Sequence, residues 1–380
     1  MLLTRLLSND FPRSRPLAII LVLLLLTLAL TPFLIPGVKA LNVAAKVLVF
    51  IVLVASFDLL LGYTGIVSFA HTMFFGIGAY GVAIASTRMG AGWTSLLVGI
   101  GGALVLSFVL AAAIGLFSLR VRAIFFSMIT LAFAAAFQTL ASQLSEVTGG
   151  EDGLTFKMPE VLSPGFRLSE TPFLGVTLDG RLLCYYLLFF VTLVLFLAML
   201  RIVNSPFGRV LQAIRENEFR AEAIGYRVVV YRTVSSVLSA LFATLAGAML
   251  SIWLRYNGPD TTLSFEIMLD VLLIVVIGGM GTVYGAAIGS GLFMVAQSYL
   301  QDLLKLANEA LSGVPWLAAL LSPDRWLLWM GLLFVLSVYY FPTGVVGRLR
   351  ALRAASRSPS LPPSAPAGSR QPIEGDYVEN

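Results

Sequence analysis

The stretch LAIILVLLLLTLALTPFLI at positions 17–35 carries no charged side chain. At 1.5 Å per residue, a helix of this length crosses the ~30 Å hydrocarbon core of a bilayer. The whole chain has 380 residues, of which 58% are apolar and only 12% charged. Soluble domains carry roughly 25% charged residues. The sequence therefore predicts an all-α, polytopic integral membrane protein.

Similar apolar runs recur along the chain, and we expect about ten membrane spans, with eight to ten compatible with the sequence. The expected spans are 17–35, 43–61, 66–86, 95–116, 123–141, 182–200, 233–253, 266–280, 284–303 and 326–341. A transmembrane β-barrel needs ~10-residue segments of alternating polarity, whereas these runs are apolar on every face, which favours helices. The third and eighth spans contain several glycines, so either one can be a broken or re-entrant helix.

The basic residues are distributed unevenly between the two sides that these spans define. With the N-terminus inside, 16 of the 25 basic residues fall in cytoplasmic segments. They are Arg5, Arg13, Arg15, Arg120, Arg122, Arg201, Arg209, Arg215, Arg220, Arg227, Arg232, Arg348, Arg350, Arg353, Arg357 and Arg370. Because cytoplasmic loops are enriched in Lys and Arg, we expect both termini in the cytoplasm.

This orientation divides the chain into a cytoplasmic N-terminus (1–16), a transmembrane domain (17–347) and a cytoplasmic tail (348–380). The longest loops are an external one at 142–181 and a cytoplasmic one at 204–232. The tail is rich in Pro, Ser, Arg and Ala from about residue 353, which predicts disorder there. A cleaved signal peptide is disfavoured, because the first apolar run is long and the Val38-Lys39-Ala40 site lies far from the N-terminus.

The composition excludes several classes of function. One Cys and one His rule out a disulfide framework, a Cys/His zinc site and a Cys–His nucleophilic pair. The basic residues lie in short loops between spans, so we expect membrane lipid as a partner and no nucleic acid. No Gly-x-x-x-x-Gly-Lys-Ser/Thr phosphate loop occurs in the sequence, so this chain does not hydrolyse ATP by that route. We therefore expect no enzyme, no bound metal and no cofactor.

The cytoplasmic loop at 204–232, NSPFGRVLQAIRENEFRAEAIGYRVVVYR, has the pattern of a short amphipathic helix. Ser205 is suited to cap this helix, Pro206 to its first turn, and Gly225 to its end. The apolar residues of the pattern are Phe207, Val210, Leu211, Ile214, Ala221 and Ile224. The polar face holds Arg215, Glu216, Glu218, Arg220 and Glu222. Such a helix fits either the membrane surface or the groove of a partner protein.

Within this loop, AIRENE (213–218) and AEA (221–223) followed by Gly225 resemble the coupling loop of ABC importer permeases of the branched-chain amino acid, LivM-type family. Other blocks of that family match in the same order. They are GYTG (62–65) with Ser68, His71 and FGIGAY (75–80); GGEDGL (149–154); IGGMGT (277–282) with Tyr284, Gly285 and Gly289; and FPTG (341–344). The resemblance covers residues 43 to 347.

The resemblance implies a permease subunit in a bacterial plasma (inner) membrane. Its partners would be a second homologous permease, two ATP-binding subunits that use ATP and Mg, and an external solute-binding protein. Coupling to the ATP-binding subunits would fall to Arg215, Glu216, Glu222 and Gly225. The default solutes are branched-chain amino acids, although related permeases carry urea, amides and other small neutral or zwitterionic solutes.

The sequence also suggests residues for the translocation path, namely Asp58, Ser68, His71, Gly76 and Gly78. The family commonly has an amide at the position of Asp58 and a glycine at Ala70. An acid at the membrane centre costs about 2.5–3.5 kcal/mol, so Asp58 is either a path residue or an acid that reaches interfacial water. For His71 we favour a neutral imidazole in a helix contact over a proton relay. The glycines favour close helix packing first and a path wall second.

Two further interpretations stay open at this stage. Glu151 and Asp152 lie in the glycine-rich external loop, where they suit either a docking surface for an external partner or a solvated turn. The main rival for the whole protein is an ion-coupled secondary transporter or channel that uses Asp58 and His71. A membrane-embedded enzyme has little support, because no cluster of His, Asp, Glu or Ser falls at one depth of the membrane.

Overall fold

A computed structural model describes residues 15–35, 37–118, 123–167, 178–310, 320–340 and 344–347. The ten predicted spans correspond to α2 (Arg15–Leu34), α3 (Val38–Thr64), α4 (His71–Met89), α5 (Trp93–Ser118), α6 (Ala123–Gln143), α8 (Gly180–Asn204), α11 (Val228–Leu254), α13 (Phe265–Gly278), α14 (Val283–Ala310) and α16 (Trp326–Tyr340). The basic residues at 5, 13, 120 and 122 and the tail with its predicted disorder lie outside the described residues.

Nine helical segments of the described residues are long and apolar enough to cross a membrane. The exception among the ten is α4, whose sequence contains glycines and polar residues throughout. This helix lies inside the bundle against α5 and α11, where protein replaces lipid around it. The chain is thus an all-α, multi-pass membrane protein, as the apolar runs predict.

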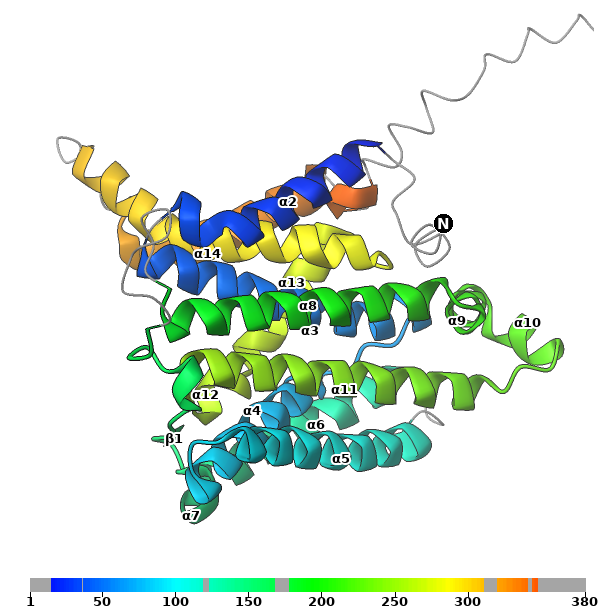
Figure 1. Cartoon of the computed structure of the whole chain (residues 1–380). Coiled ribbons are helices and arrows are strands. Elements are labelled where there is room, and N and C mark those ends of the chain that lie inside the picture. The colour runs from blue at the N-terminus through cyan, green and yellow to red at the C-terminus, as the bar shows by residue number, and fades with distance from the viewer. Residues whose placement is uncertain are drawn as a thin grey trace, which may run out of the picture.

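The long helices run side by side across the bundle (Figure 1), and α3 forms its centre. In the most apolar 18-residue stretch of α3, 94% of the residues are buried, whereas the same stretch of α6 has 17% of its residues buried. The helix α3 therefore lies in the core of the bundle and α6 at its periphery. Two short helices, α9 (Pro206–Glu216) and α10 (Glu218–Ala223), project from one end of the bundle. We call this the α9 end.

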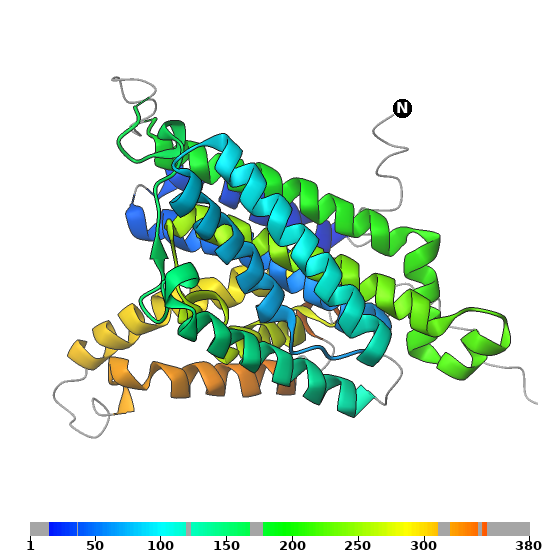
Figure 2. The same cartoon turned by 90° about the horizontal axis from the view of Figure 1, so that it is seen from below.

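The opposite end, which we call the β1 end, carries short elements. They are α7 (Ser145–Thr148), β1 (Leu154–Thr155), the 3-10 helix η1 (Glu160–Leu162), β2 (Tyr256–Asn257) and α12 (Pro259–Thr262), and a second 3-10 helix, η2 (Pro323–Arg325), precedes α16. The strands β1 and β2 pair antiparallel, with Leu154 opposite Asn257 and Thr155 opposite Tyr256. This pairing joins the loop after α6 to the end of α11 (Figure 2).

The helices α4 and α13 of the two glycine-rich spans are themselves continuous, and the non-helical backbone lies at their ends. The third predicted span begins with the non-helical segment 65–70, and the helix starts only at His71. The eighth is bounded by a break after α12 and by the turn 279–282 before α14. Three of the glycines in these segments have the positive φ that favours glycine, +74° at Gly65, +111° at Gly279 and +77° at Gly281.

Small residues bring α4 and α11 into close contact. A Cβ atom added at Gly78 would overlap the carbonyl oxygen of Thr244, and one at Gly247 would overlap that of Phe75. Helices in membranes associate through such small residues because these let the backbones approach closely. The packing role that the sequence favours for Gly78 is therefore the one that its contacts display.

Gly78→Ala is expected to lower the stability of the bundle. Overpacking costs about 1–3 kcal/mol, and the clashing Thr244 atom belongs to the backbone, which cannot rotate away. We expect the unfolding temperature in mild detergent to fall by several degrees. The matched control is Gly101→Ala, because nothing lies within 4 Å of a Cβ at Gly101. Equal unfolding temperatures for the two variants would contradict the close contact.

Candidate functional site

The loop between α8 and α11 begins as its sequence predicts. Ser205 caps α9, and its side-chain oxygen accepts a hydrogen bond from the Gly208 backbone N–H at 3.4 Å. Pro206 occupies the first turn, where its missing N–H costs nothing. Leu211 and Ile214 form the buried face of α9, and the Phe207 ring stacks on Tyr231 of α11 at 5.7 Å.

The expectation of one continuous helix up to Gly225 is wrong. Asn217 has an extended backbone (φ −157°, ψ 98°) that ends α9, and its side-chain oxygen accepts a hydrogen bond from Arg220 N–H at 2.8 Å. Asn217 is therefore the N-cap of a second helix, α10. The chain turns again at Gly225, which has a φ of +95°.

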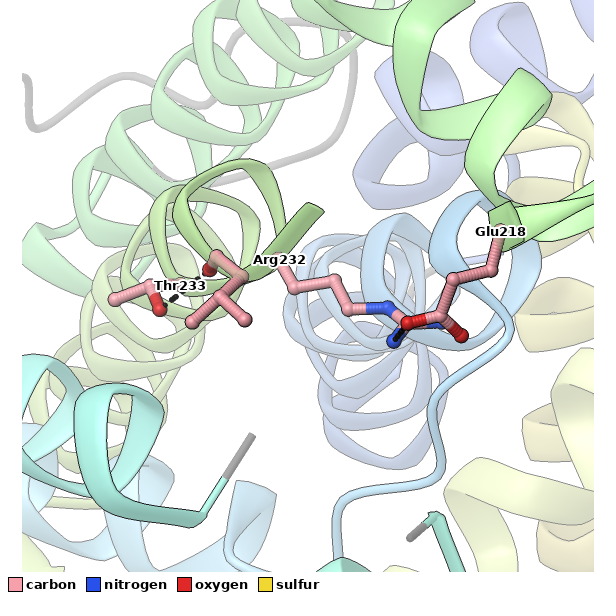
Figure 3. A network of polar contacts seen from close by, with 4 residues as sticks. Glu218, Arg232 and Thr233 are labelled. Atoms are coloured by element: carbon pink, nitrogen blue, oxygen red, sulfur yellow. Dashed lines mark hydrogen bonds and ion pairs between the residues drawn. The ribbon is translucent and has the colours of Figure 1, made fainter. Parts of the chain in front are cut away.

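The second helix is tied back to the bundle by an ion pair. Arg232 donates to both carboxylate oxygens of Glu218, at 2.6 and 2.9 Å, which is a two-point contact (Figure 3). Ala221 is buried in a cluster with Ile214 and Val228, so α10 also has an apolar contact to the rest of the loop. These contacts hold α9 and α10 in a fixed orientation relative to α11.

The tip of the loop presents apolar side chains to solvent. Phe219 is 83% exposed and Ile224 is 68% exposed. The sequence pattern assigns Ile224 to the buried face, which is wrong because the break at Asn217 changes the helix phase. Phe219 was missed altogether. Glu216, Glu222 and Gly225 are exposed as well. We call Phe219 and Ile224, together with these three predicted coupling residues, the loop tip.

Arg215, the fourth predicted coupling residue, is exposed too, but its guanidinium also contacts the bundle. Its guanidinium donates to the carbonyl oxygen of Gly62 near the end of α3, and its Nη1 lies 3.0 Å from where a Cβ of Gly281 would sit. Arg215 therefore connects α9 to both α3 and the turn between α13 and α14. The role of the four residues in coupling stays a prediction.

Asp58 lies at the same junction and is buried, with 1% exposure. Its Oδ1 accepts a hydrogen bond from the Gly281 N–H at 2.8 Å, and its Oδ2 has no hydrogen-bond partner among the described residues. Asp58 is therefore not an acid that reaches interfacial water, which was one of its two interpretations. We call Asp58, Gly62, Arg215 and Gly281 the α9 junction.

His71 is buried a short distance away and contacts different residues. Its Nε2 lies 2.8 Å from the Ser56 hydroxyl oxygen, and its ring meets Phe57 edge to face at 5.2 Å. No contact joins His71 to Asp58 among the described residues. The geometry is that of an imidazole in a helix contact, which is the interpretation that the sequence favours.

The other predicted path residues are also enclosed by this chain. Ser68 lies buried in the segment 65–70, and a Cβ at Gly76 would overlap the side chain of Leu263. Asp58, His71, Gly76 and Gly78 each contact different residues, so the predicted path residues do not form one cluster. Their part in translocation stays a prediction.

At the β1 end, Glu151 and Asp152 are exposed on a tight turn. Gly149, Gly150 and Gly153 around them all have positive φ, between +65° and +78°. The turn is anchored because the Tyr256 hydroxyl donates to the Asp152 carbonyl oxygen at 3.1 Å, next to the β1–β2 pairing. The two acids are thus displayed on a fixed turn. The role of the two acids in docking an external partner stays a prediction.

These features describe a multi-pass membrane bundle with an anchored amphipathic helix pair at one end, and no metal-binding cluster of His, Cys, Asp or Glu occurs among the described residues. The chain belongs to the family of branched-chain amino acid transport system permease components, whose family model matches residues 39–338.

Two curated relatives are named high-affinity branched-chain amino acid transport system permease protein LivM. The one from Salmonella typhimurium is 27% identical over 74% of this chain and 68% of its own length. The one from Escherichia coli is 26% identical over 80% of this chain and 73% of its own length. A probable branched-chain amino acid transport permease protein LivM from Methanocaldococcus jannaschii is 26% identical over 66% of this chain and 70% of its own. No solved structure matches the chain.

Proposed function

We propose that this chain is the permease subunit of an ATP-driven importer and couples to ATP-binding subunits through the loop tip. The observation that carries the proposal is the exposure of Phe219 and Ile224 on a loop that is otherwise firmly anchored. Exposed aromatic side chains on a fixed scaffold, ringed by charges such as Glu222, are typical of protein-docking sites. The chain carries no Gly-x-x-x-x-Gly-Lys-Ser/Thr motif, so in this proposal the partner subunits hydrolyse the ATP.

In this proposal the α9 end faces the cytoplasm of a bacterium and lies at the inner face of the plasma membrane. Arg209, Arg215, Arg220 and Arg227 in the α8–α11 loop support this orientation through the positive-inside rule. ATP-driven closure of two docked subunits would push on α10, and the α9 junction would pass the movement to α3 and α14. Alternating access to the two sides of the membrane is the mechanism expected from such a movement.

A second homologous permease would complete the translocation path, and an external solute-binding protein would dock at the β1 end. In this proposal the exposed charges of Glu151 and Asp152 would steer the encounter of the two proteins. The names of the relatives favour a branched-chain amino acid as the solute. A similar small neutral or zwitterionic solute would suit the same architecture.

The experiment that tests the proposal is purification of the tagged chain from its native membrane in mild detergent. We expect a second permease and ATP-binding subunits to co-purify, identified by mass spectrometry, together with ATPase activity. Glu222→Arg reverses a charge at the loop tip, so the variant is expected to lose most of this activity. Glu309→Arg reverses an exposed acid at the end of α14 and serves as the matched control.

If the chain purifies alone and without ATPase activity, under conditions that preserve other membrane complexes, the proposal is wrong. If the Glu222→Arg and Glu309→Arg complexes have equal ATPase activity, the chain is still part of an ATP-driven complex, but coupling through the loop tip is wrong.

The rival, ion-coupled transport through Asp58 and His71, is tested by Asp58→Asn. An asparagine keeps a side-chain oxygen for the Gly281 N–H and removes the ionisable carboxyl group, so an ATP-driven permease is expected to retain at least half of its uptake. An ion-coupled carrier would lose uptake, because an amide does not exchange a proton. Uptake of labelled leucine into membrane vesicles distinguishes the two results.

A further inference from the structure

The helix α13 begins part-way through the thickness of the bundle and not at one of its two ends. Its first residue, Phe265, has its ring 6.1 Å from that of Phe69. The Phe69 backbone N–H donates to the Thr130 hydroxyl at 3.0 Å, and Thr130 lies seven residues beyond the start of α6. At 1.5 Å per residue, Thr130 lies about 10 Å along α6 from its first residue, Ala123. Phe69, and with it the start of α13, lies at the same depth in the bundle.

One face of α13 is open in this chain. Met268, Val271, Ile274 and Val275 form its buried face. The open face consists of Phe265, Glu266, Leu269, Asp270 and Leu273, which recur at helical spacing and are exposed or half-buried. Two of these five side chains are therefore acids on an open surface within the span.

These acids have few partners among the described residues. Asp270 accepts a hydrogen bond from the Gln297 amide of α14 at 3.4 Å, and no ion pair of Glu266 or Asp270 is present in the described part of the chain. A carboxylate that faces hydrocarbon costs about 2.5–3.5 kcal/mol, and acids within spans almost always face water or protein. The open face of α13 is therefore not expected to lie against lipid.

Other open surfaces of the bundle are suited to lipid. The exposed large side chains of α5 are all apolar and include Leu97, Val105 and Phe108. A cavity of about 390 Å³ between α2, α3, α8 and α14 is likewise lined by leucines and other apolar side chains. Lys46 of α3 is exposed about 12 Å from the start of its helix, but the long stem of a lysine lets its ammonium reach the membrane surface.

Interrupted backbone lies at both ends of α13. The non-helical segment 65–70 meets its start through Phe69, and the turn 279–282 follows its end. Figure 1 shows α13 crossing the bundle obliquely between α12 and α14. Non-helical backbone at membrane depth occurs where it is buried in protein or lines a water-filled cavity, and broken helices mark the substrate sites of several transporters.

We propose that the open face of α13 lines the aqueous translocation path, with Glu266 and Asp270 directed to the water. The inference rests on the proposed function, because the second permease would close the other side of the path. The path would then not run past Asp58 and His71, which are enclosed by this chain. It would run along the open face of α13, which the sequence analysis did not identify.

The test is cysteine labelling in native membranes with charged thiosulfonate reagents, which react only where water reaches. Leu269→Cys and Leu273→Cys report on the open face of α13. Val105→Cys on α5 is the control, since Leu269 and Val105 are both well exposed in this chain, at 44% and 65%. The unaltered chain provides the blank, because its single cysteine, Cys184, is buried.

We expect the α13 cysteines to react at least tenfold faster than Val105→Cys. The acids should attract a cationic reagent, so it should react several-fold faster than an anionic one of the same size, and Glu266→Gln should reduce this preference. If both α13 cysteines react as slowly as Val105→Cys, or if fast labelling shows no preference for the cation, the inference is wrong. ATP-dependent uptake by the same variants separates this failure from a failure of the proposed function.

Discussion

Phe219→Ala is expected to abolish most ATP-driven transport while leaving the membrane bundle folded. The side chain is 83% exposed, so its removal costs the isolated chain little stability. In the assembled transporter an aromatic anchor of this kind contributes about 2 kcal/mol or more to docking, which corresponds to roughly 30-fold weaker binding. The measurement is the amount of ATP-binding subunit retained by the tagged chain, together with the rate of solute uptake.

The matched control is Phe190→Ala in α8. Phe190 is 63% exposed, but it lies within a membrane span, where lipid covers it. We expect this variant to retain its subunits and its uptake. If Phe219→Ala behaves like Phe190→Ala, the loop tip is not the docking surface.

Arg215→Ala is expected to uncouple ATP hydrolysis from transport without releasing the ATP-binding subunits. Its guanidinium bonds to the Gly62 carbonyl and reaches the turn at Gly281, so its loss removes the polar contact of α9 with the end of α3 and with the turn before α14. Because its guanidinium is bonded to Gly62 of this chain, docking should persist. We expect the solute transported per ATP hydrolysed to fall about tenfold, consistent with a charge-assisted hydrogen bond of roughly 1.5 kcal/mol.

Arg209→Ala removes an exposed arginine from the same helix and is the control for charge. An equal effect of the two substitutions would show that net charge matters rather than the α9 junction. Loss of the ATP-binding subunits from the Arg215→Ala complex would show instead that Arg215 acts in docking.

The membrane spans and the N-cap of α9 could be predicted because both depend on residues that are close together in the sequence. Apolar runs of sufficient length specify helices in a bilayer, and Ser205 followed by Pro206 specifies the start of α9. The break at Asn217 carried a local signal as well, since asparagine is a favoured N-cap. Recognising it would have placed Phe219 and Ile224 outside the buried face.

The α9 junction was beyond sequence reasoning because its contacts are distant in the chain. Asp58 and Gly281 are separated by 223 positions, and Arg215 and Gly62 by 153. Glu266, the first residue of the expected span 266–280, is a different case. Its position at the edge of an apolar run suggests a membrane surface, whereas α12 and the break after it carry the chain along α4 before α13 begins.

The most direct test of the central claim is uptake of labelled leucine by proteoliposomes that contain the purified complex. We predict uptake only when ATP is present on the side of the α9 end and the solute-binding protein on the other, with no effect of ionophores that collapse ion gradients. Uptake that proceeds without ATP and stops when an ionophore is added would contradict an ATP-driven permease.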